Sequence, residues 1–253
     1  MGGLMKAIIV AAGPGGRLSP FTDRKPKCLL EIGGQTILER ELEALRENGI
    51  EDIMVVRGYC SHLINYPNVT YCHNPDFRKN NILRSLFCAE DEMNDDFIFS
   101  YSDILYSREI VAKLIHSEAD IALIVDVNWI EHYKGRNLHP ISEAELVKVE
   151  SGRIVKIGKE VVSPEEAHGE FIGLAKFTRS GTGVMRAAYH RVARECPAAP
   201  FHHATSLEKA YMTDMFQELV DTGSLVKNVD IEGGWMEIDT TQDLERAQEL
   251  FGL

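Results

Sequence analysis

Hydrophobic and polar residues follow two alternating patterns along the first half of the chain. Continuous apolar runs, which are typical of buried strands, occupy residues 7–11, 52–59, 69–74, 96–103 and 120–127. Between these runs, apolar positions recur every three or four residues, which predicts helices over 36–49, 80–93 and 108–118. Thr36 and Glu39 have the spacing of a capping box, and Gly49 suits the end of the first helix. Strands that alternate with helices form a mostly parallel sheet with helices on both faces.

The pattern changes after Val127. Residues 144–161 alternate on both sides of Ser151-Gly152, which predicts a hairpin. We expect further strands at 170–177, 225–231 and 235–239, and helices near 181–195, 205–221 and 240–251. Thr205 and Glu208 have capping-box spacing in the second of these helices. No repeat or linker interrupts the chain, so we expect a single domain over 5–253. Its predicted fold is an α/β, Rossmann-like three-layer sandwich, with a mostly parallel mixed sheet and a small antiparallel excursion over 128–180.

Composition and charge narrow the classes of function. The 253 residues are 44% hydrophobic, which is ordinary for a globular chain that buries a core. The formal net charge of −12 argues against nucleic acid as a partner, because such surfaces are normally basic. No apolar run reaches the roughly 18 residues of a membrane span, so no membrane partner is expected. The five cysteines form no C-x-x-C pair, which favours reduced thiols and a cytoplasmic location. A homodimer is one option for the assembly.

A glycine-rich turn follows the first predicted strand. In parallel sheets, ligands bind beyond the carboxyl ends of the strands, where such a turn lets backbone N–H groups approach phosphate oxygens. Gly13, Gly15 and Gly16 suit this role. The Walker pattern is absent, and the dinucleotide pattern G-x-G-x-x-G fails because position 18 is Leu18. The turn therefore predicts a phosphate site of another kind.

The run A-A-G-P-G-G-R-L-S-P-F-T from Ala11, followed by Pro26-Lys27, resembles the signature of nucleotidyltransferases that join a nucleoside triphosphate to a sugar phosphate or a phosphorylated alcohol. Pro14 and Gly16 depart from it, since many members have Ser or Thr at the latter position. The resemblance implies nucleotide binding by Ala12, Gly13, Gly15 and Gly16. It also implies that Arg17 forks onto the β,γ-phosphates and that Lys27 lies near the α-phosphate and the acceptor. Positioned cations suit this chemistry because negative charge builds on phosphate oxygens during transfer.

Acidic residues in two distant segments are candidates for a metal site. Asp103 ends a predicted strand, and Glu237 and Asp239 are two apart on another, so their side chains share a face. Mg²⁺ prefers such carboxylates together with phosphate oxygens, although an Asp after a strand is also a common helix cap or turn former. The resemblance implies that the three acids bind Mg²⁺. The E-I-D form is most similar to cytidylyltransferases that act on phosphocholine and related phosphonates.

The nucleoside end is predicted from two further segments. The stretch N-N-I-L-R-S-L at 80–86 also resembles the cytidylyltransferase group. Asn81 and Ser85 are four apart on one helical face, where an amide and a hydroxyl could read a pyrimidine edge. Asn81 is equally suited to capping the helix. Gly58-Tyr59, at the end of a strand, could flank the base.

Candidate acceptor-binding residues lie in the second half of the chain. Family members often have a lysine near the hairpin that meets the acceptor's phosphate; Lys156 and Lys159 are the candidates here. Arg136 is another candidate anion anchor, and Glu170 could receive a substrate ammonium group. Aromatic side chains could stack on that amine, although core packing is their more common role. The aromatic candidates are Tyr101, Trp129 and Tyr133.

Together these features predict a magnesium-dependent cytidylyltransferase of the small phosphocholine or 2-aminoethylphosphonate type. The expected reaction transfers CMP from CTP to a small phosphonate or phosphorylated amine and releases pyrophosphate. One alternative is a sugar-1-phosphate nucleotidyltransferase that uses another nucleoside triphosphate. The other is a non-catalytic nucleotide-sensing module, which would have no need to keep the metal carboxylates.

Overall fold

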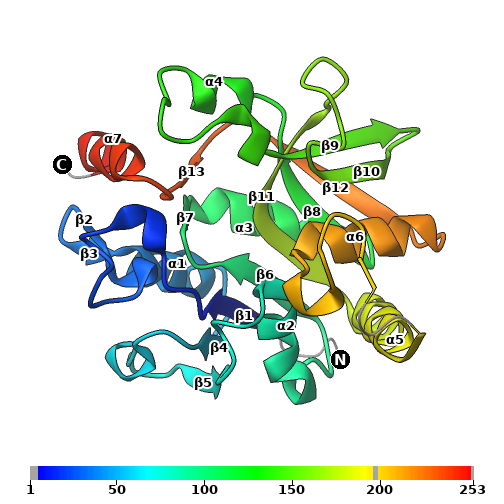
Figure 1. The fold of residues 1–253 in the computed structure, drawn as a ribbon, viewed down its shortest axis with the longest axis horizontal. Helices are drawn as coiled ribbons and strands as arrows, with labels where there is room; N and C mark the ends of the chain where they lie inside the picture. The colour runs from blue at the N-terminus through cyan, green and yellow to red at the C-terminus, as the bar shows by residue number, and fades with distance from the viewer. Residues whose placement is uncertain (1–4, 196–198, 252–253) are drawn as a thin grey trace.

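A central sheet with helices on both faces forms the body of the molecule (Figure 1). The structure is a computed structural model that describes residues 5–195 and 199–251. Cys196 lies outside the described residues. Among the described residues, no helix combines the length and the apolar character needed to cross a membrane. The predicted α/β three-layer sandwich is confirmed.

Nine of the described strands form one sheet. Seven run side by side in the order β5-β4-β1-β6-β11-β8-β12, and the hairpin β9–β10 joins at the start of β11. The strands of this sheet are β1 Lys6–Ala11, β4 Asp52–Arg57, β5 Thr70–His73, β6 Phe97–Tyr101, β8 Ile121–Asp126, β9 Glu145–Glu150, β10 Arg153–Lys159, β11 Gly169–Phe177 and β12 Val226–Ile231. Two small antiparallel pairs lie apart from it: β2 Glu31–Ile32 with β3 Gln35–Thr36, and β7 Ile104–Tyr106 with β13 Trp235–Glu237.

The described helices are α1 Ile37–Arg46, α2 Ile82–Leu86, α3 Arg108–His116, α4 Ile130–Tyr133, α5 Arg179–Glu195, α6 Met212–Asp221 and α7 Thr241–Phe251. One face of the sheet is covered by α2, α5 and α6 and the other by α1 and α3, whereas α4 and α7 pack on smaller apolar clusters. The predicted capping box of α1 is present: Thr36 Oγ1 accepts from Glu39 N at 3.1 Å, and Glu39 Oε2 accepts from Thr36 N at 2.7 Å. Gly49 follows α1 in a left-handed conformation with φ of 78°.

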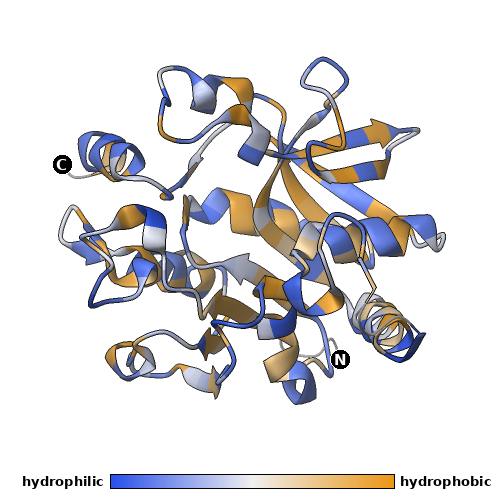
Figure 2. Cartoon of the chain, in the orientation of Figure 1, coloured by the Kyte–Doolittle hydropathy of each residue, from blue (hydrophilic) through white to orange (hydrophobic). Residues whose placement is uncertain are grey.

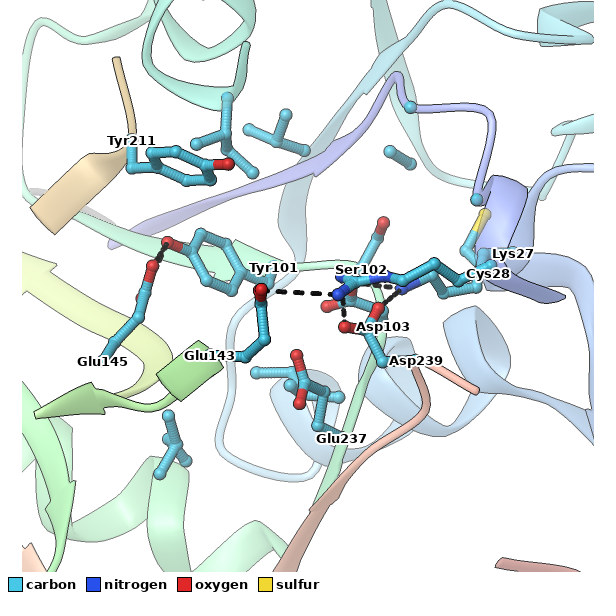
Figure 3. Close-up of a pocket in the computed structure, with 18 of the residues that line it drawn as sticks. Lys27, Cys28, Tyr101, Ser102, Asp103, Glu143, Glu145, Tyr211, Glu237 and Asp239 are labelled. Carbon is cyan, nitrogen blue, oxygen red and sulfur yellow. Dashed lines mark hydrogen bonds and ion pairs between the residues drawn. The ribbon is translucent and has the colours of Figure 1, made fainter. Parts of the chain in front are cut away.

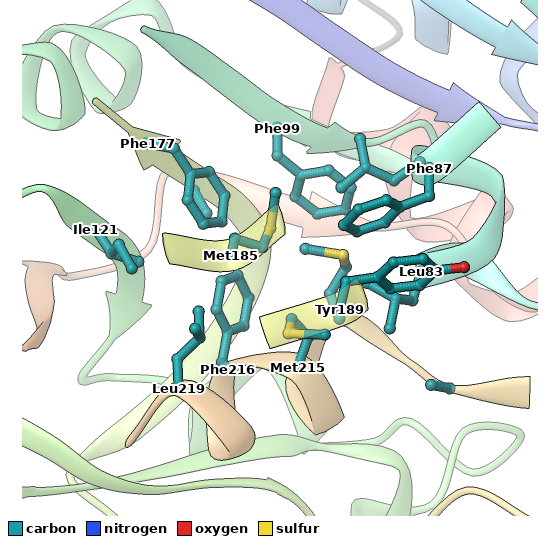
Figure 4. Packing of buried hydrophobic residues seen from close by; sticks show 14 of the residues in the cluster. Leu83, Phe87, Phe99, Ile121, Phe177, Met185, Tyr189, Met215, Phe216 and Leu219 are labelled. Carbon is teal, nitrogen blue, oxygen red and sulfur yellow. The ribbon is translucent and has the colours of Figure 1, made fainter. Parts of the chain in front are cut away.

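Alternation along the central strands places apolar side chains in two separate cores. On β1, Ile8 and Val10 point into the core under α2, α5 and α6, whereas Ala7, Ile9 and Ala11 point into the core under α1 and α3. Figure 2 shows hydrophobic colour concentrated on these strands and on the helix faces toward them. The first core is rich in aromatic and methionine side chains from β6, β11 and the covering helices (Figure 4).

Three local expectations need correction. The hairpin at 144–161 is present, but β11 is an internal strand that pairs antiparallel with both β6 and β8. The helix predicted over 80–93 is α2 followed by a 3₁₀ segment at 87–92, with a kink at Ala89. Thr205 and Glu208 form no capping box, because α6 begins only at Met212. There the Asp214 carboxylate accepts from Tyr211 N at 2.7 Å.

A third apolar cluster attaches the glycine-rich segment to the end of the chain. Leu18, Leu30 and Ile32 pack with Ile238 and Leu244, although the two segments are more than 200 residues apart in sequence. This cluster fixes the segment that carries Arg17 and Lys27 beside the segment that carries Glu237 and Asp239. The site is therefore positioned by buried apolar contacts.

Glu41 is a buried carboxyl group behind the site and gives a stability prediction. It is 1% exposed, and Ser100 Oγ donates to its Oε2 at 3.2 Å. Burial, and then the nearby charge of Asp103, raise the pKa of Glu41 well above its usual value. Because the pKa of Glu41 is higher in the folded than in the unfolded state, its contribution to stability is fully present below the unfolded-state pKa. This contribution is lost as pH rises toward the folded-state pKa.

We therefore expect Glu41→Gln to gain stability relative to the wild type as pH rises from 5 to 8. The free energy of unfolding of Glu41→Gln, relative to that of the wild type, should rise by about 1.4 kcal/mol for each pH unit above pH 5. The rise should stop at the folded-state pKa of Glu41 if that pKa lies below pH 8. Urea unfolding at both pH values measures it, with the exposed Glu43→Gln on the same helix as control. A difference between Glu41→Gln and wild type that stays constant with pH would show that Glu41 is ionised in the fold.

Candidate active site

A cavity of about 390 Å³ opens at the carboxyl ends of β1 and β6 (Figure 3). Seven segments that are distant in sequence line it: the glycine-rich turn with the residues up to Cys28, the start of α2, the residues after β6, the β9–β10 hairpin with the residues before it, β11, Tyr211 before α6, and the segment around β13. This is the place where an open parallel sheet binds ligands. The predicted site residues that line it are Gly13, Gly15, Gly16, Arg17, Lys27, Asn81, Tyr101, Asp103, Lys159, Glu170, Glu237 and Asp239.

The glycine-rich turn is shaped around Lys27. Gly15 has φ of 61°, and a Cβ there would lie 3.1 Å from Lys27 Cβ. The buried Thr22 donates to Gly15 O at 2.8 Å, which fixes the turn from within. A Cβ at Gly13 or Gly16 would meet no atom within 4 Å, so the turn leaves open space on the cavity side. Such an open turn can admit a phosphate to its backbone N–H groups.

Lys27 joins the two distant acids. Its Nζ lies 2.7 Å from Asp103 Oδ2 and 2.5 Å from Asp239 Oδ1, and Arg17 pairs with the other oxygen of Asp239. Burial lowers the pKa of Lys27, but the Asp103 and Asp239 carboxylates raise it more, so the ammonium stays charged. Burial raises the pKa of Asp239, but Lys27 and Arg17 lower it to about 2. The convergence predicted for these side chains is present.

Arg136 has a different place from the one predicted. It does not line the cavity, and its guanidinium holds Asp243 through Nε at 2.6 Å and Nη2 at 3.0 Å. Nη2 also donates to Glu237 Oε2 at 3.1 Å. In this arrangement Arg136 orients Glu237 from behind, because the buried Asp243 and the part-buried Glu237 already take its donors. Its role as an acceptor anchor stays a prediction that these contacts do not support.

The acidic cluster fits a divalent cation. Asp103 Oδ1 is buried without a hydrogen-bond partner, and the oxygen donors of Asp103, Glu237 and Asp239 line one cavity. Hard cations such as Mg²⁺ prefer oxygen donors of this kind. His139 adds nitrogen atoms 3.5 Å from Glu237 Oε2 and 3.4 Å from Asp239 Oδ2. Burial and the positive charge of Arg136 lower the pKa of His139 to about 4, which keeps the imidazole neutral at pH 7.

The expected nucleoside contacts are only partly at the cavity. Asn81 lines it, but its Oδ1 accepts from Ile82 N at 2.8 Å and its Nδ2 donates to Lys209 O at 3.1 Å, so it does cap α2. Ser85 is buried away from the cavity, where its hydroxyl accepts from Asn74 at 2.9 Å and donates to Asn81 O at 3.1 Å. The predicted Asn81–Ser85 pair therefore does not face a ligand together.

Gly58 and Tyr59 support the glycine-rich turn from outside the cavity. Tyr59 N donates to Ala12 O at 3.0 Å, and the Tyr59 hydroxyl donates to Asp23 O at 2.6 Å. A Cβ at Gly58 would lie 2.6 Å from Ala12 O, so only glycine fits there. Neither these two residues nor Ala12 lines the cavity. Direct nucleotide contacts from these three residues therefore stay a prediction, and the contacts that they make here support the turn.

The predicted acceptor end contains tyrosine–carboxylate pairs. The Tyr101 hydroxyl donates to Glu145 Oε2 at 3.1 Å, and the Tyr133 hydroxyl donates to Glu170 Oε1 at 2.7 Å. Lys159 donates to Glu143 Oε2 at 2.8 Å, and its Nζ lies 4.9 Å from the centre of the Tyr211 ring.

Two aromatic or basic candidates are absent from this end. Trp129 lines no part of the cavity, because it packs in a small core with Ala144, Leu146 and Val162. This position gives no support to its predicted stacking on the acceptor. Lys156 is exposed on β10, so Lys159 is the hairpin lysine that reaches the cavity.

Several site residues were missed by sequence reasoning. Glu145 had a detectable signal, since it shares a strand face with the apolar Val147 and Val149. His139 and Glu143 lie in a loop without periodicity, and nothing in the sequence marks them.

Six carboxylates and three cations among the described residues line the cavity, so an anionic nucleotide would need added positive charge.

Comparison with known proteins agrees with this geometry. The profile of the MobA-like NTP transferase domain matches residues 7–148. The chain is 35% identical over 252 residues to the CTP:phosphoglutamine cytidylyltransferase of Campylobacter jejuni, covering 95% of this chain and 98% of that protein. It is also 35% identical over 119 residues to the choline-phosphate cytidylyltransferase of Haemophilus influenzae, covering 45% of this chain and 51% of that protein.

A solved structure extends the similarity to the whole fold. The inositol-1-phosphate CTP transferase from T. maritima superposes with a TM-score of 0.75 at 25% identity, covering 99% of this chain and 96% of that one. The match of the family profile includes the glycine-rich turn, Lys27 and Asp103. The chain therefore belongs to the family of MobA-like NTP transferase domains and is a nucleotidyltransferase.

Proposed function

We propose that the protein is a CTP-dependent cytidylyltransferase that transfers CMP to the phosphate or phosphonate oxygen of a small amine-bearing acceptor and releases pyrophosphate. The observation that carries this proposal is the Lys27 ammonium held between Asp103 and Asp239 at the glycine-rich turn. The relatives named for cytidylyl transfer to phosphoglutamine and choline phosphate support CTP and a phosphorylated acceptor.

The reaction needs no nucleophilic side chain. An acceptor oxygen attacks the α-phosphorus of CTP, the bond from that phosphorus to the bridging oxygen breaks, and pyrophosphate leaves with the electron pair. The acceptor oxygen is already largely ionised at neutral pH, so no strong general base is required. Transfer then depends on position and on charge stabilisation.

Lys27 and Arg17 supply fixed positive charge for this step. Lys27 is held by two carboxylates, so its ammonium need not be reoriented from solvent when charge develops on the phosphate oxygens. Arg17 is half-exposed at the mouth, where its planar fork suits the β,γ-phosphates. Asp103, Glu237 and Asp239 would hold Mg²⁺, which when bound neutralises phosphate charge.

A panel of substrates tests the proposal. Pyrophosphate release is measured with CTP, UTP, dTTP and GTP against phosphoethanolamine, 2-aminoethylphosphonate, phosphocholine, phosphoglutamine and glucose 1-phosphate. We expect release with CTP and amine-bearing acceptors, and loss of release when EDTA removes Mg²⁺. Release that requires glucose 1-phosphate and another nucleotide would favour a sugar-1-phosphate nucleotidyltransferase. Nucleotide binding without any product would favour a sensing module.

A further inference from the structure

Glu170 is a buried carboxylate with one oxygen left without a partner. The residue is 6% exposed and lines the cavity. Oε1 accepts from the Tyr133 hydroxyl at 2.7 Å, whereas Oε2 is buried and has no hydrogen-bond partner. A buried acceptor without a donor is costly, so this atom indicates a ligand that brings a hydrogen.

Glu145 adds a second carboxylate to the same end of the cavity. It is 7% exposed on β9, next to β11, and the Tyr101 hydroxyl is its donor. Figure 3 shows Glu145 and Tyr101 on the opposite side of the cavity from Lys27. Burial raises the pKa of Glu170 to about 8 and that of Glu145 to about 7, with a further contribution to Glu170 from the charge of Glu145.

The nearby cations are already engaged. Lys159 donates to Glu143 at 2.8 Å, and Arg136 is bound to Asp243 and Glu237. This end of the cavity therefore has two buried acids and an unfilled acceptor atom. Because burial disfavours negative charge here, this end also disfavours a second phosphate or carboxylate, whereas a cation that donates hydrogen bonds would stabilise the ionised form of Glu170.

A quaternary ammonium group does not meet this requirement. It has no N–H donor and is normally bound by aromatic faces, best by tryptophan. Trp129 is packed in the core behind the site, and Trp235, which does line the cavity, lies on β13 beside Glu237 at the metal end. The aromatic rings at the cavity include Tyr101, whose hydroxyl is bound to Glu145, so a carboxylate accompanies the ring there. A primary ammonium group instead offers three donors and a full charge.

We propose that the acceptor carries a primary ammonium group that donates to Glu170 Oε2 beside Glu145, and that the site discriminates against the N-trimethylated form of the same acceptor. This inference rests on the proposed function and names the class of acceptor. The carboxylate pair, with its tyrosine donors, thus acts as a specificity element. Its expected contribution is that of a charge-assisted hydrogen bond, about 10- to 100-fold in affinity or in kcat/KM.

Matched acceptors test this inference. The probes are aminoalkyl phosphates with two to five carbons and their N-trimethyl counterparts, with n-alkyl phosphates, which have no ammonium group, as controls. kcat/KM comes from pyrophosphate release with CTP and Mg²⁺, and the affinity of the protein alone comes from calorimetric titration. We expect an aminoalkyl phosphate to exceed its N-trimethyl counterpart at least about tenfold. Equal values, or a preference for the N-trimethyl series, would overturn the proposal.

Two variants assign the preference to Glu170. Glu170→Gln keeps an acceptor for the Tyr133 hydroxyl but removes the charge. It should reduce the ratio of kcat/KM for an aminoalkyl phosphate to kcat/KM for its N-trimethyl counterpart to nearly one. Tyr133→Phe keeps the charge and loosens the carboxylate, and it should give an intermediate ratio. The exposed Glu166→Gln should keep the wild-type ratio. An unchanged ratio in Glu170→Gln would overturn the assignment.

Failure of this inference and failure of the proposed function give different results. Absence of pyrophosphate with every acceptor would end the proposed function. The titration of the protein alone needs no turnover and would still show whether the primary amines bind better than their N-trimethyl forms.

Discussion

Replacement of Lys27 by alanine is expected to lower kcat by about 10³, with a smaller effect on CTP affinity. Its ammonium is the cation that the glycine-rich turn and two carboxylates fix in the cavity, so it stabilises charge that develops only during transfer. Such a loss falls mainly on the chemical step, because Arg17 and the backbone N–H groups of the turn remain to bind the triphosphate. Steady-state rates of pyrophosphate release, together with calorimetric CTP binding, measure the two effects separately.

Arg24→Ala provides the matched control. Arg24 is exposed in the same segment, two residues before Pro26, and does not line the cavity. It should keep the wild-type kcat. Thermal unfolding of both variants shows whether the loss of Lys27, which leaves Asp103 and Asp239 without their shared partner, also affects the fold. Nearly intact turnover in a folded Lys27→Ala protein that still binds CTP would contradict the proposed role.

Asp239→Asn is expected to have the second large effect, a decrease in kcat of about 10²–10³. The substitution keeps the size of the side chain but removes the charge that pairs with Lys27 and Arg17 and would help hold Mg²⁺. Because the metal and the triphosphate would be bound together, CTP affinity in the presence of Mg²⁺ should fall as well. Rates and CTP affinities are compared at several Mg²⁺ concentrations.

The control for this variant is Asp221→Asn, an exposed acid at the end of α6. It should leave kcat and the dependence on Mg²⁺ unchanged. A wild-type kcat in Asp239→Asn at low Mg²⁺ would show that Asp239 only completes the local turn, which was the alternative that its sequence setting allowed.

The catalytic end of the site could be predicted from sequence because local patterns define it. The glycine-rich turn with Arg17 and Lys27 is a contiguous segment, and Asp103 follows β6 at the carboxyl edge of the parallel sheet. Asp239 follows β13, which lies outside that sheet in an antiparallel pair with β7, but the E-I-D pattern is itself local. Alternation and capping signals were likewise sufficient for most strands and for α1. In each case, the information lies within a few residues of the feature that it predicts.

The rest of the site depends on tertiary packing, which leaves no local signal. Trp129 and Arg136 suited an acceptor pocket by residue type, but one fills a small core and the other is bound by Asp243, about 100 residues away. Ser85 had the right spacing but faces Asn74. β11 was predicted within the small antiparallel excursion over 128–180, and nothing local showed that it would pair with a central strand on each side.

Binding of Mn²⁺, followed by electron paramagnetic resonance with and without CTP, tests most directly whether the glycine-rich turn and the distant acids act on one triphosphate. If they do, CTP should increase the affinity of the wild-type protein for Mn²⁺ at least about tenfold, as expected for coupled ligands. This increase should be lost in both Asp103→Asn and Asp239→Asn. An equal increase in the wild type and both variants would mean that these carboxylates and the nucleotide do not share a metal, and the account would be wrong.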